Sequence, residues 1–264
     1  MNVRSTQIIE GRYARHLEKV REAELENVRP LFSPGARVLE LGGATGYQAS
    51  IIASWGCDVV SIDVPDRSAP LRALYYPVQD YDGENIPYPD ESFDIVFSSL
   101  VLPSIKNRSR SLVETRRVLK PEGLTIHIVP SRTWRLWTSL SHPAWLLSLL
   151  LGRLRRSASS RAAEAPPANG DRNKPSLLFR ARKVLLRGPA GEYPSTLSEF
   201  YHWSKACWAT LLEENGFEVK RISSSELLYT GNALMPGIPV RARRVLARLL
   251  GTSSYVFVAK KSRA

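Results

Sequence analysis

Residues that could bind a ligand stand at the ends of the first two apolar segments of this sequence. Residues 36–41 are typical of a buried strand and run into the turn Gly42-Gly43-Ala44-Thr45-Gly46, after which residues 47–55 are typical of a helix. A glycine turn before a helix N-terminus lets a ligand approach the backbone amides closely. Asp63 ends the next apolar segment, 21 positions after Gly42, where a carboxylate can accept hydrogen bonds from both hydroxyls of a ribose. The spacing predicts a site for a nucleoside-bearing cofactor.

The elements that would position these residues alternate between strand and helix. Strands are predicted at residues 36–41, 58–63, 93–98 and 124–129, and helices at 10–32, 47–55 and 109–119. This alternation is typical of a parallel sheet with helices on both faces. Residues 197–215 are predicted to form one helix, and residues 217–222 and 255–259 are expected to complete the sheet as its last, antiparallel pair. The sequence therefore predicts an α/β fold.

Four motifs follow one another in a characteristic order. They are Val38-Leu39-Glu40-Leu41-Gly42-Gly43-Ala44-Thr45-Gly46, then Ser61-Ile62-Asp63-Val64, then residues 82–96, and then Arg117-Val118-Leu119-Lys120-Pro121-Glu122-Gly123-Leu124. Together they resemble the class I S-adenosylmethionine-dependent methyltransferases, of the type-11 kind, over about residues 35–130. The resemblance implies a Rossmann-like seven-stranded methyltransferase sheet with helices on both faces and an inserted lid before the last two strands. Ala44 stands where the family usually has the middle glycine of its turn.

The resemblance also implies the cofactor S-adenosyl-L-methionine and a set of residues that bind it. These are Glu40, Gly42, Gly43, Gly46, Asp63, Val64, Asp82, Gly83 and Ser98. The three glycines of the turn would line the methionine portion, and Glu40 would reach its ammonium group. Asp63 would hold the ribose, Val64 would pack on the adenine, and Asp82 with the glycine after it would lie at the adenine edge. Ser98, with Ser99 beside it, would lie near the sulfonium.

Several of these residues have a simpler interpretation that the sequence leaves open. Glu40 could cap a helix, and Asp82 could merely begin a turn with Gly83. Asp80 is a rival to Asp82 for the adenine contact, because spacing alone does not separate the two. Asp94 is expected to support the sheet rather than touch a ligand.

No catalytic residue is assigned by the sequence. Methyl transfer needs a base only if the acceptor loses a proton, and the candidates are His127 and His202. His127 alternates with isoleucines on a predicted strand, which is more typical of a core histidine. His202 lies in an aromatic cluster that could pack a helix or line an acceptor pocket. The two cysteines, Cys57 and Cys207, form no CxxC pair, so no metal site is predicted.

The chain is expected to have four parts. These are an N-terminal helical cap at residues 1–34, the S-adenosylmethionine-binding core at 35–130, a basic, Trp/Leu-rich and partly disordered insertion or lid at 131–190, and C-terminal helices and strands at 191–264. Residues 134–156 combine tryptophans and leucines with an arginine cluster, which suits either a lid over the acceptor or peripheral contact with an anionic membrane. A weaker likeness of the last third to cell-surface polysaccharide and natural-product methyltransferases favours a small-molecule, glycan or lipid-linked acceptor.

The charge of the chain and its distribution indicate which classes of binding partner to expect. The net charge is +12, with 43% hydrophobic and 23% charged residues, as expected of a globular protein with a core. Basic residues concentrate in residues 151–187 and 238–264, and the remainder is close to neutral, so no nucleic-acid partner is expected. The N-terminal residues lack an apolar segment, which predicts a cytoplasmic protein, with a peripheral place at the inner membrane face left open.

Two other functions would use the same fold. A nicotinamide-dependent oxidoreductase would need the same turn and acidic residue, but the GxGxxG spacing is absent here. A catalytically silent membrane- or partner-binding protein would keep the cofactor pocket without turnover. The prediction of an S-adenosylmethionine-dependent methyltransferase is the one that the ordered motifs favour.

Overall fold

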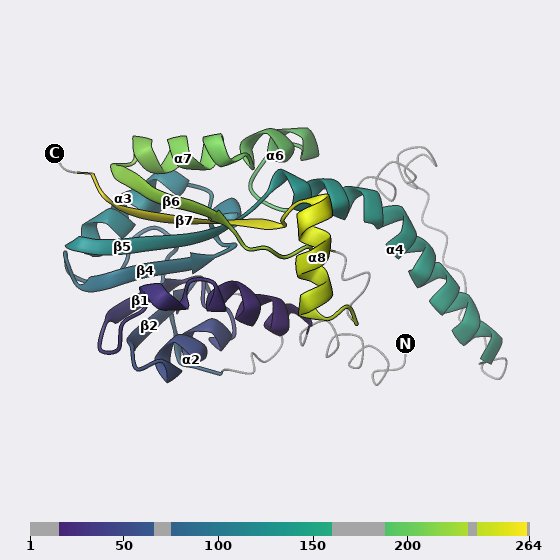
Figure 1. Ribbon diagram of the computed structural model, residues 1–264, viewed down its shortest axis with the longest axis horizontal. Helices are drawn as coiled ribbons and strands as arrows, with labels where there is room; N and C mark the ends of the chain where they lie inside the picture. The colour runs from purple at the N-terminus through teal and green to yellow at the C-terminus, as the bar shows by residue number, and fades with distance from the viewer. Residues whose placement is uncertain (1–15, 66–74, 160–187, 232–236, 263–264) are drawn as a thin grey trace, which may run out of the picture.

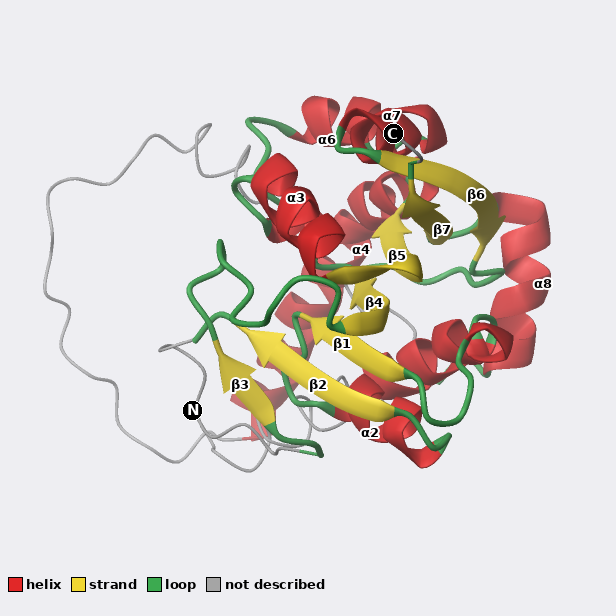
Figure 2. Ribbon diagram, turned by 90° about the vertical axis from the view of Figure 1, so that its left-hand side faces the viewer, coloured by secondary structure: helices red, strands yellow, loops and turns green. Residues whose placement is uncertain are grey.

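A seven-stranded sheet forms the centre of the computed structural model, which describes residues 16–65, 75–159, 188–231 and 237–262 (Figure 1). The strands are β1 (Arg37–Leu41), β2 (Asp58–Asp63), β3 (Val78–Asp80), β4 (Phe93–Ser99), β5 (Leu119–Pro130), β6 (Phe217–Ser224) and β7 (Ser254–Lys261). They lie in the order β3-β2-β1-β4-β5-β7-β6, with β3 at one edge and β6 at the other (Figure 2). The predicted α/β class and Rossmann-like methyltransferase sheet are confirmed.

The direction of the strands decides where a ligand can bind. The first five strands are parallel, and β7 lies antiparallel between β5 and β6, as predicted for the closing pair. The carboxyl ends of the parallel strands therefore meet at one edge of the sheet, which is where open α/β sheets bind ligands.

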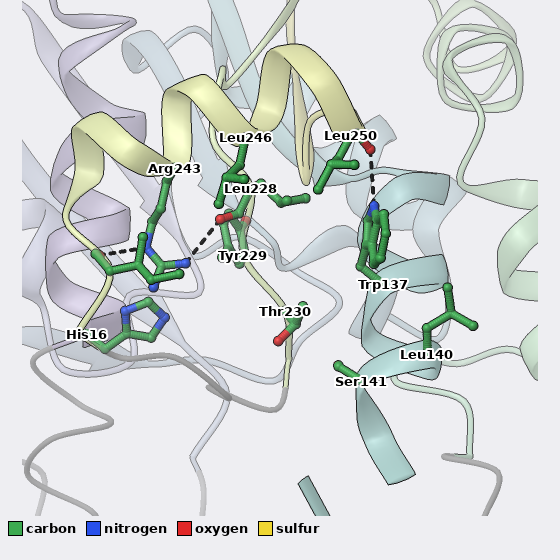
Figure 3. Close-up of a pocket in the computed structure, with 11 residues that line it drawn as sticks. His16, Trp137, Leu140, Ser141, Leu228, Tyr229, Thr230, Arg243, Leu246 and Leu250 are labelled. Atoms are coloured by element: carbon green, nitrogen blue, oxygen red, sulfur yellow. Dashed lines mark hydrogen bonds between the residues drawn. The ribbon is translucent and has the colours of Figure 1, made fainter. Parts of the chain in front are cut away.

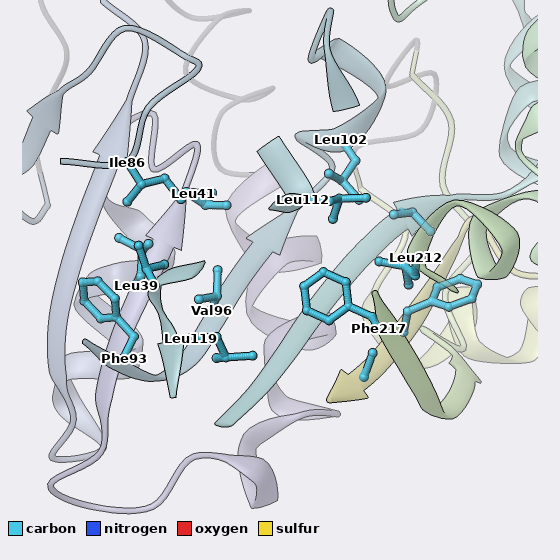
Figure 4. Close-up of a cluster of buried hydrophobic side chains, with 14 of the residues drawn as sticks. Leu39, Leu41, Ile86, Phe93, Val96, Leu102, Leu112, Leu119, Leu212 and Phe217 are labelled. Atoms are coloured by element: carbon cyan, nitrogen blue, oxygen red, sulfur yellow. The ribbon is translucent and has the colours of Figure 1, made fainter. Parts of the chain in front are cut away.

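Helices cover both faces of the sheet. The described helices are residues 16–26, α2 (Tyr47–Ser54), α3 (Arg108–Val118), α4 (Arg132–Ser159), α6 (Thr196–His202), α7 (Lys205–Glu214) and α8 (Val240–Leu250), with short 3₁₀ turns η1 (Arg29–Leu31) and η2 (Leu102–Ser104). One face of the sheet packs under α3, α6 and α7 through a large apolar cluster (Figure 4). The other face packs against α2 and the helix 16–26. Because both faces are buried at the centre of the sheet, β1 and β4 are mostly buried along their length, whereas the edge strands β3 and β6 are more exposed.

Some predicted boundaries are wrong, for local reasons. The helix expected at 197–215 is two helices, because Ser204 begins α7 by accepting a hydrogen bond from the Cys207 N–H. The turn before the predicted strand 124–129 is a bulge inside β5, since the pairing jumps from Phe93↔Leu119 to Ile95↔Leu124. Strand β3 and helix α8 were not predicted.

Two other predicted segments lie only partly within the described residues. The helix predicted at 10–32 is seen as residues 16–26 followed by η1, and its first six residues lie outside the described residues. Residues 132–159 form the long helix α4, whereas residues 160–187 of the insertion predicted at 131–190 lie outside the described residues. The division of the chain into four parts stays a prediction.

Asp94 takes the supporting role that was expected of it. Its carboxylate accepts hydrogen bonds from the Arg37 backbone N–H at 2.9 Å and from Lys120 Nζ at 2.8 Å. The side chain thereby joins β4 to both neighbouring strands, β1 and β5. This contact lies at the amino-terminal end of the sheet, away from the edge where ligands bind.

Candidate functional site

The glycine turn after β1 is held tightly between other parts of the chain. Gly42 and Gly46 have φ angles of 76° and 74°, in the left-handed region that favours glycine. A Cβ at Gly42 would lie 2.2 Å from Val101 Cγ2, and one at Gly46 would lie 2.4 Å from the Tyr76 carbonyl oxygen. Gly46 is also the N-cap of α2, and no side chain caps that helix. Amides of its first turn are therefore available to a ligand.

Asp63 is joined directly to this turn. Its Oδ2 accepts a hydrogen bond from the Ala44 N–H and its Oδ1 accepts one from the Val64 N–H, both at 2.8 Å. Each carboxylate oxygen retains a further lone pair for a ligand hydroxyl. Ala44 itself adopts a φ of 47°, so the residue that replaces the family's glycine still takes the left-handed conformation. The predicted cofactor residues of β1 and β2 therefore lie together.

Glu40 lies beneath the turn. It is 2% exposed, and its Oε2 accepts a hydrogen bond of 2.6 Å from Ser61 Oγ. A Cβ at Gly43 would lie 1.9 Å from Ser61 Oγ and 2.9 Å from Glu40 Oε2, so the glycine covers this pair. Burial raises the pKa of Glu40 to about 7; the Ser61 hydrogen bond opposes the rise and the nearby Asp63 adds to it. A neighbouring cation would stabilise the ionised form of Glu40.

Ser61 is a site residue that the sequence analysis did not single out. It lies opposite Glu40 in the register of β1 and β2. The pairing of these two strands was the one signal that could have found it, because a polar residue inside a buried strand needs a partner. The Glu40–Ser61 contact excludes the interpretation of Glu40 as a helix cap.

The loop expected at the adenine edge approaches β2 as predicted. A Cβ at Gly83 would lie 3.1 Å from Val64 Cγ2, and Val64 is 46% exposed. The Asp82 carboxylate, however, accepts hydrogen bonds from the Glu84 N–H and from the backbone and side-chain amides of Asn85. These bonds, the Asn85 backbone bond first, lower the pKa of Asp82 to about 2. The carboxylate thus builds the turn, and its contact with adenine stays a prediction.

Arg117 of α3 fixes the rest of this loop. Its guanidinium donates to the carbonyl oxygens of Ile86 and Tyr88 at 2.9 and 2.8 Å and pairs with Asp90. It also pairs with Glu114, whose Oε2 accepts the Ile86 N–H at 3.1 Å. The loop between β3 and β4 is therefore held against α3 through its carbonyl oxygens, by Arg117, and through one of its N–H groups, by Glu114. Arg117, the first residue of the fourth motif, therefore has a structural role in positioning this loop.

Ser98 and His127 lie inside the sheet. Ser98 Oγ is 2.7 Å from His127 Nδ1, and Thr125 Oγ1 is 2.8 Å from His127 Nε2. Burial lowers the pKa of His127 to about 4, so the ring is neutral at physiological pH. His127 is therefore a core histidine, and the geometry does not support a role as base. Ser99 Oγ, at the end of β4, is buried without a hydrogen-bond partner among the described residues, which favours Ser99 over Ser98 as the serine near a ligand.

His202 lies at the end of α6 and is exposed. Its Nδ1 is 2.8 Å from the Ser198 carbonyl oxygen, and its ring packs against those of Tyr193 and Tyr201. Tyr193 also lies under the Arg108 guanidinium, 4.2 Å from its ring centre. This places His202 near the segment that follows β4, and its role as a base stays a prediction.

A buried ion pair organises the region around this segment. Arg135 of α4 and Glu199 of α6 are both fully buried, with Arg135 Nε 3.2 Å from Glu199 Oε2. Glu199 Oε1 accepts hydrogen bonds from the backbone N–H groups of Ala190 and Gly191. The pair therefore joins α4, α6 and the segment that precedes α6. No feature of the sequence indicated this contact.

The same segment is joined to the turn that follows β4. The Glu192 N–H donates to the Pro103 carbonyl oxygen in η2 at 2.9 Å. The Arg108 guanidinium also donates to this oxygen, at 3.0 Å, and to the Glu192 carbonyl oxygen, at 3.3 Å. Residues 190–192 are therefore held beside the carboxyl end of β4, between the buried ion pair and the start of α3.

An apolar cavity of about 480 Å³ lies at the same edge of the sheet, farther toward β7 (Figure 3). Its lining comes mainly from α4, α8, residues 228–230 and the helix 16–26, and comprises His16, Trp137, Leu140, Ser141, Leu228, Tyr229, Thr230, Ile238, Arg243, Leu246 and Leu250. Trp137 Nε1 donates to the Leu250 carbonyl oxygen at 3.1 Å and so joins α4 to α8. None of the predicted cofactor residues lines this cavity. The cavity is therefore distinct from the predicted cofactor residues.

Comparison with known proteins identifies the core of the chain. A family model described as a methyltransferase domain matches residues 39–127, which contain the glycine turn, Asp63 and the loop up to β5. The chain is 30% identical over 119 residues to the ubiquinone/menaquinone biosynthesis C-methyltransferase UbiE of Cupriavidus metallidurans, covering 41% of this chain and 47% of the relative. It is also 30% identical over 111 residues to the biotin biosynthesis bifunctional protein BioHC of Cellvibrio japonicus, covering 40% and 22%.

Solved structures agree with the fold. An S-adenosylmethionine-dependent methyltransferase from Thermotoga maritima superposes with a TM-score of 0.53 at 18% identity, covering 98% of this chain and 97% of that one. A second, from Mesorhizobium loti, gives a TM-score of 0.52 at 16% identity, covering 90% and 98%. The chain matches less than half the length of the two curated relatives named above. The match identifies residues 39–127 as a methyltransferase domain, which favours the predicted family over the oxidoreductase alternative, and the solved structures share the fold of the whole chain.

Proposed function

We propose that this chain transfers the methyl group of S-adenosylmethionine to an apolar acceptor, either a small molecule or a lipid-linked one. The observation that carries the proposal is the joined arrangement of the glycine turn, Asp63 and the buried Glu40 at the carboxyl edge of the sheet. The similarity to a C-methyltransferase of ubiquinone and menaquinone biosynthesis supports methyl transfer as the reaction.

The residues present fit this cofactor. Glu40 is a buried carboxyl that a nearby ammonium group would ionise, and the Asp63 oxygens can accept ribose hydroxyls. The first turn of α2 has no side-chain cap, and Val64 with Gly83 leaves an apolar surface for a flat ring. When bound, the sulfonium supplies an electrophilic methyl carbon for in-line displacement.

The protein's own contribution to the reaction would be positioning. Holding the acceptor atom in line with the methyl carbon can supply a large share of the acceleration, about 7–11 kcal/mol in ideal cases. The apolar cavity between α4 and α8 supports an acceptor with a hydrophobic portion, since it is lined mainly by aliphatic and aromatic side chains. A general base would be required only for an acceptor that must lose a proton.

Calorimetric titration tests the cofactor. We expect S-adenosylmethionine and S-adenosylhomocysteine to bind, and NAD and NADP not to bind. Asp63→Ala should weaken binding of the sulfur nucleosides by more than about tenfold, since two charge-assisted hydrogen bonds are lost. The matched control is Asp58→Ala, which removes an exposed carboxylate at the opposite, amino-terminal end of the same strand β2. Preference for a nicotinamide cofactor, or equal losses in both variants, would contradict the proposal.

A transfer assay then distinguishes an active methyltransferase from a catalytically silent binding protein. Labelled methyl groups from S-adenosylmethionine should appear in the organic phase when the chain is incubated with a lipid and small-molecule extract of the source cells. Asp63→Ala should abolish this signal while Asp58→Ala retains it. Tight cofactor binding with no transfer to any fraction would favour the catalytically silent binding protein instead.

A further inference from the structure

Helix α4 carries apolar side chains on a face that the rest of the described structure leaves exposed. Leu136, Leu140 and Leu147 are 44%, 60% and 57% exposed. Their spacing of four and seven residues puts them on one side of the helix. The opposite side is buried through Arg135 and Thr138. The exposed leucines are therefore a stripe along the helix rather than scattered residues.

Helix α8 also exposes apolar side chains and adds positive charge. Val245, Leu249 and Leu250 are 56%, 77% and 40% exposed. Arg241 and Arg248 are also exposed and lie seven residues apart on one edge of the helix, while the helix contains no acidic residue. An exposed apolar face bordered by arginines is the pattern of a helix that lies in a membrane interface.

The two helices meet around the mouth of the apolar cavity. Trp137 of α4 donates its indole N–H to the carbonyl oxygen of Leu250 in α8 (Figure 3). Leu140 and Leu250 line the cavity and are also exposed, so the cavity and the outer surface share side chains. Figure 1 shows both helices beyond the carboxyl edge of the sheet. We call the exposed side chains of these two helices, together with the mouth of the cavity between them, the α4–α8 face.

We propose that the α4–α8 face docks onto the surface of an anionic lipid bilayer. Large aliphatic side chains exposed together mark an interaction site, and the charge of this part of the chain indicates the partner. The exposed Arg241 and Arg248 border the apolar side chains of α8, and their charge complements a surface of anionic lipid headgroups. Among the described residues, no helix is both long and apolar enough to cross a bilayer.

The docking surface has a consequence for the acceptor, which rests on the proposed function. A cavity whose mouth lies on the α4–α8 face could receive the apolar portion of an acceptor directly from the bilayer. Docking itself does not depend on methyl transfer. Cofactor titration in the absence of lipid therefore tests the proposed function separately from the membrane contact.

Flotation of the full chain with vesicles tests the docking. We expect binding to phosphatidylcholine vesicles that contain phosphatidylglycerol, and weaker binding without the anionic lipid or at high salt. Leu249→Glu should lower vesicle binding by about tenfold or more, because it removes an apolar side chain from the interface and adds a like charge to it. Arg248→Glu should lower it by about fivefold or more on anionic vesicles only.

Matched variants elsewhere keep the test specific. Val113 of α3 is 47% exposed, and Arg221 of the edge strand β6 is exposed. Val113→Glu and Arg221→Glu should leave vesicle binding unchanged. Equal losses in these controls, or no flotation of folded wild-type protein, would overturn the proposal. So would a stable dimer in solution that Leu249→Glu dissociates, since a second copy would then cover the face.

Discussion

The two ends of the candidate site are built by different means. On the cofactor side, formed by β1, β2 and the loops that follow them, the backbone makes the site. Left-handed glycines, a strand end and an uncapped helix place the amides, and Asp63 binds the turn directly. On the acceptor side, formed by α4, α6 and α8, side chains from distant positions make the site. Its fixed points are the Arg135–Glu199 pair and the Trp137–Leu250 contact.

This difference explains why the family model matches the cofactor side and not the acceptor side. A backbone turn needs glycine and an acidic residue at fixed places, and the family model matches the chain only over residues 39–127. A cavity lined by aliphatic side chains tolerates many replacements of similar volume. Cofactor recognition therefore leaves a readable pattern, whereas acceptor recognition is free to vary.

Replacement of Arg135 should give the largest effect on stability. Arg135→Met leaves the fully buried Glu199 without its cation, and breaking one partner of such a pair costs about 3–5 kcal/mol. The free energy of unfolding, measured in urea by circular dichroism, should fall by that amount. The damage should be confined to the acceptor side, so the variant should still bind S-adenosylhomocysteine under conditions where it is folded.

A neighbouring arginine provides the control. Arg132 lies in the same helix, donates to the Tyr201 carbonyl oxygen and packs over the Phe200 ring at its partly exposed end. Arg132→Met should cost no more than about 1 kcal/mol. If the two variants are equally stable, the buried ion pair does not contribute the expected stability. If Arg135→Met abolishes cofactor binding in the folded protein, the two sides are not independent.

Glu40 should make the cofactor side sensitive to pH. Its pKa is about 7 when folded, against an ordinary value of 4.5, so the folded state holds a proton that the unfolded state releases. The free energy of unfolding should therefore fall as pH rises from about 4.5 to about 7, by on the order of 3 kcal/mol from this group. Glu40→Gln removes this dependence. The measurement is urea unfolding of both proteins across this pH range.

Cofactor binding should show the opposite trend. The ammonium group of S-adenosylhomocysteine favours ionised Glu40, so its affinity should increase as pH rises through about 7 in the wild type and not in Glu40→Gln. Glu84→Gln, which replaces an exposed glutamate of the loop after β3, is the matched control and should behave like the wild type. An unchanged pH profile in Glu40→Gln would separate Glu40 from the ammonium group.

The sequence was sufficient for the parts of the molecule that are determined locally. The strand–turn–helix unit of β1 and α2 and the position of Asp63 were predicted because each depends on residues close together in the chain. The antiparallel closing pair was predicted from the order of elements along the chain and is confirmed by the pairing of β7 with β5 and β6. The exposed three-residue strand β3 carries no apolar signal, and it was missed for that reason.

The acceptor side could not be predicted in the same way. Arg135 and Glu199 are 64 positions apart, and either one alone looks like a surface charge. Helix α8 was counted only as part of the basic residues 238–264. Its arginines drew attention away from the apolar residues between them, so no helix was predicted there. The contact between Trp137 and Leu250 joins residues from two elements that only the folded chain brings together.

The smallest effect should come from restoring the family's glycine at Ala44. The left-handed φ of 47° costs alanine about 1 kcal/mol, but glycine loses a similar amount of free energy through its greater freedom in the unfolded chain. Ala44→Gly should therefore change the free energy of unfolding by less than about 1 kcal/mol. The hydrogen bond from this N–H to Asp63 needs no side chain, so affinity for S-adenosylhomocysteine should be unchanged.

Gly46→Ala is the variant with which the small effect of Ala44→Gly should be compared. A Cβ at Gly46 would lie 2.4 Å from the backbone oxygen of Tyr76, at a φ of 74°, so the turn or the neighbouring segment must move. That variant should lose both stability and affinity in the same urea and calorimetric measurements. A larger loss in Ala44→Gly than in Gly46→Ala would mean that the methyl of Ala44 contributes to the site. The expected order instead means that close backbone packing fixes the glycine at position 46, whereas position 44 requires only the left-handed conformation.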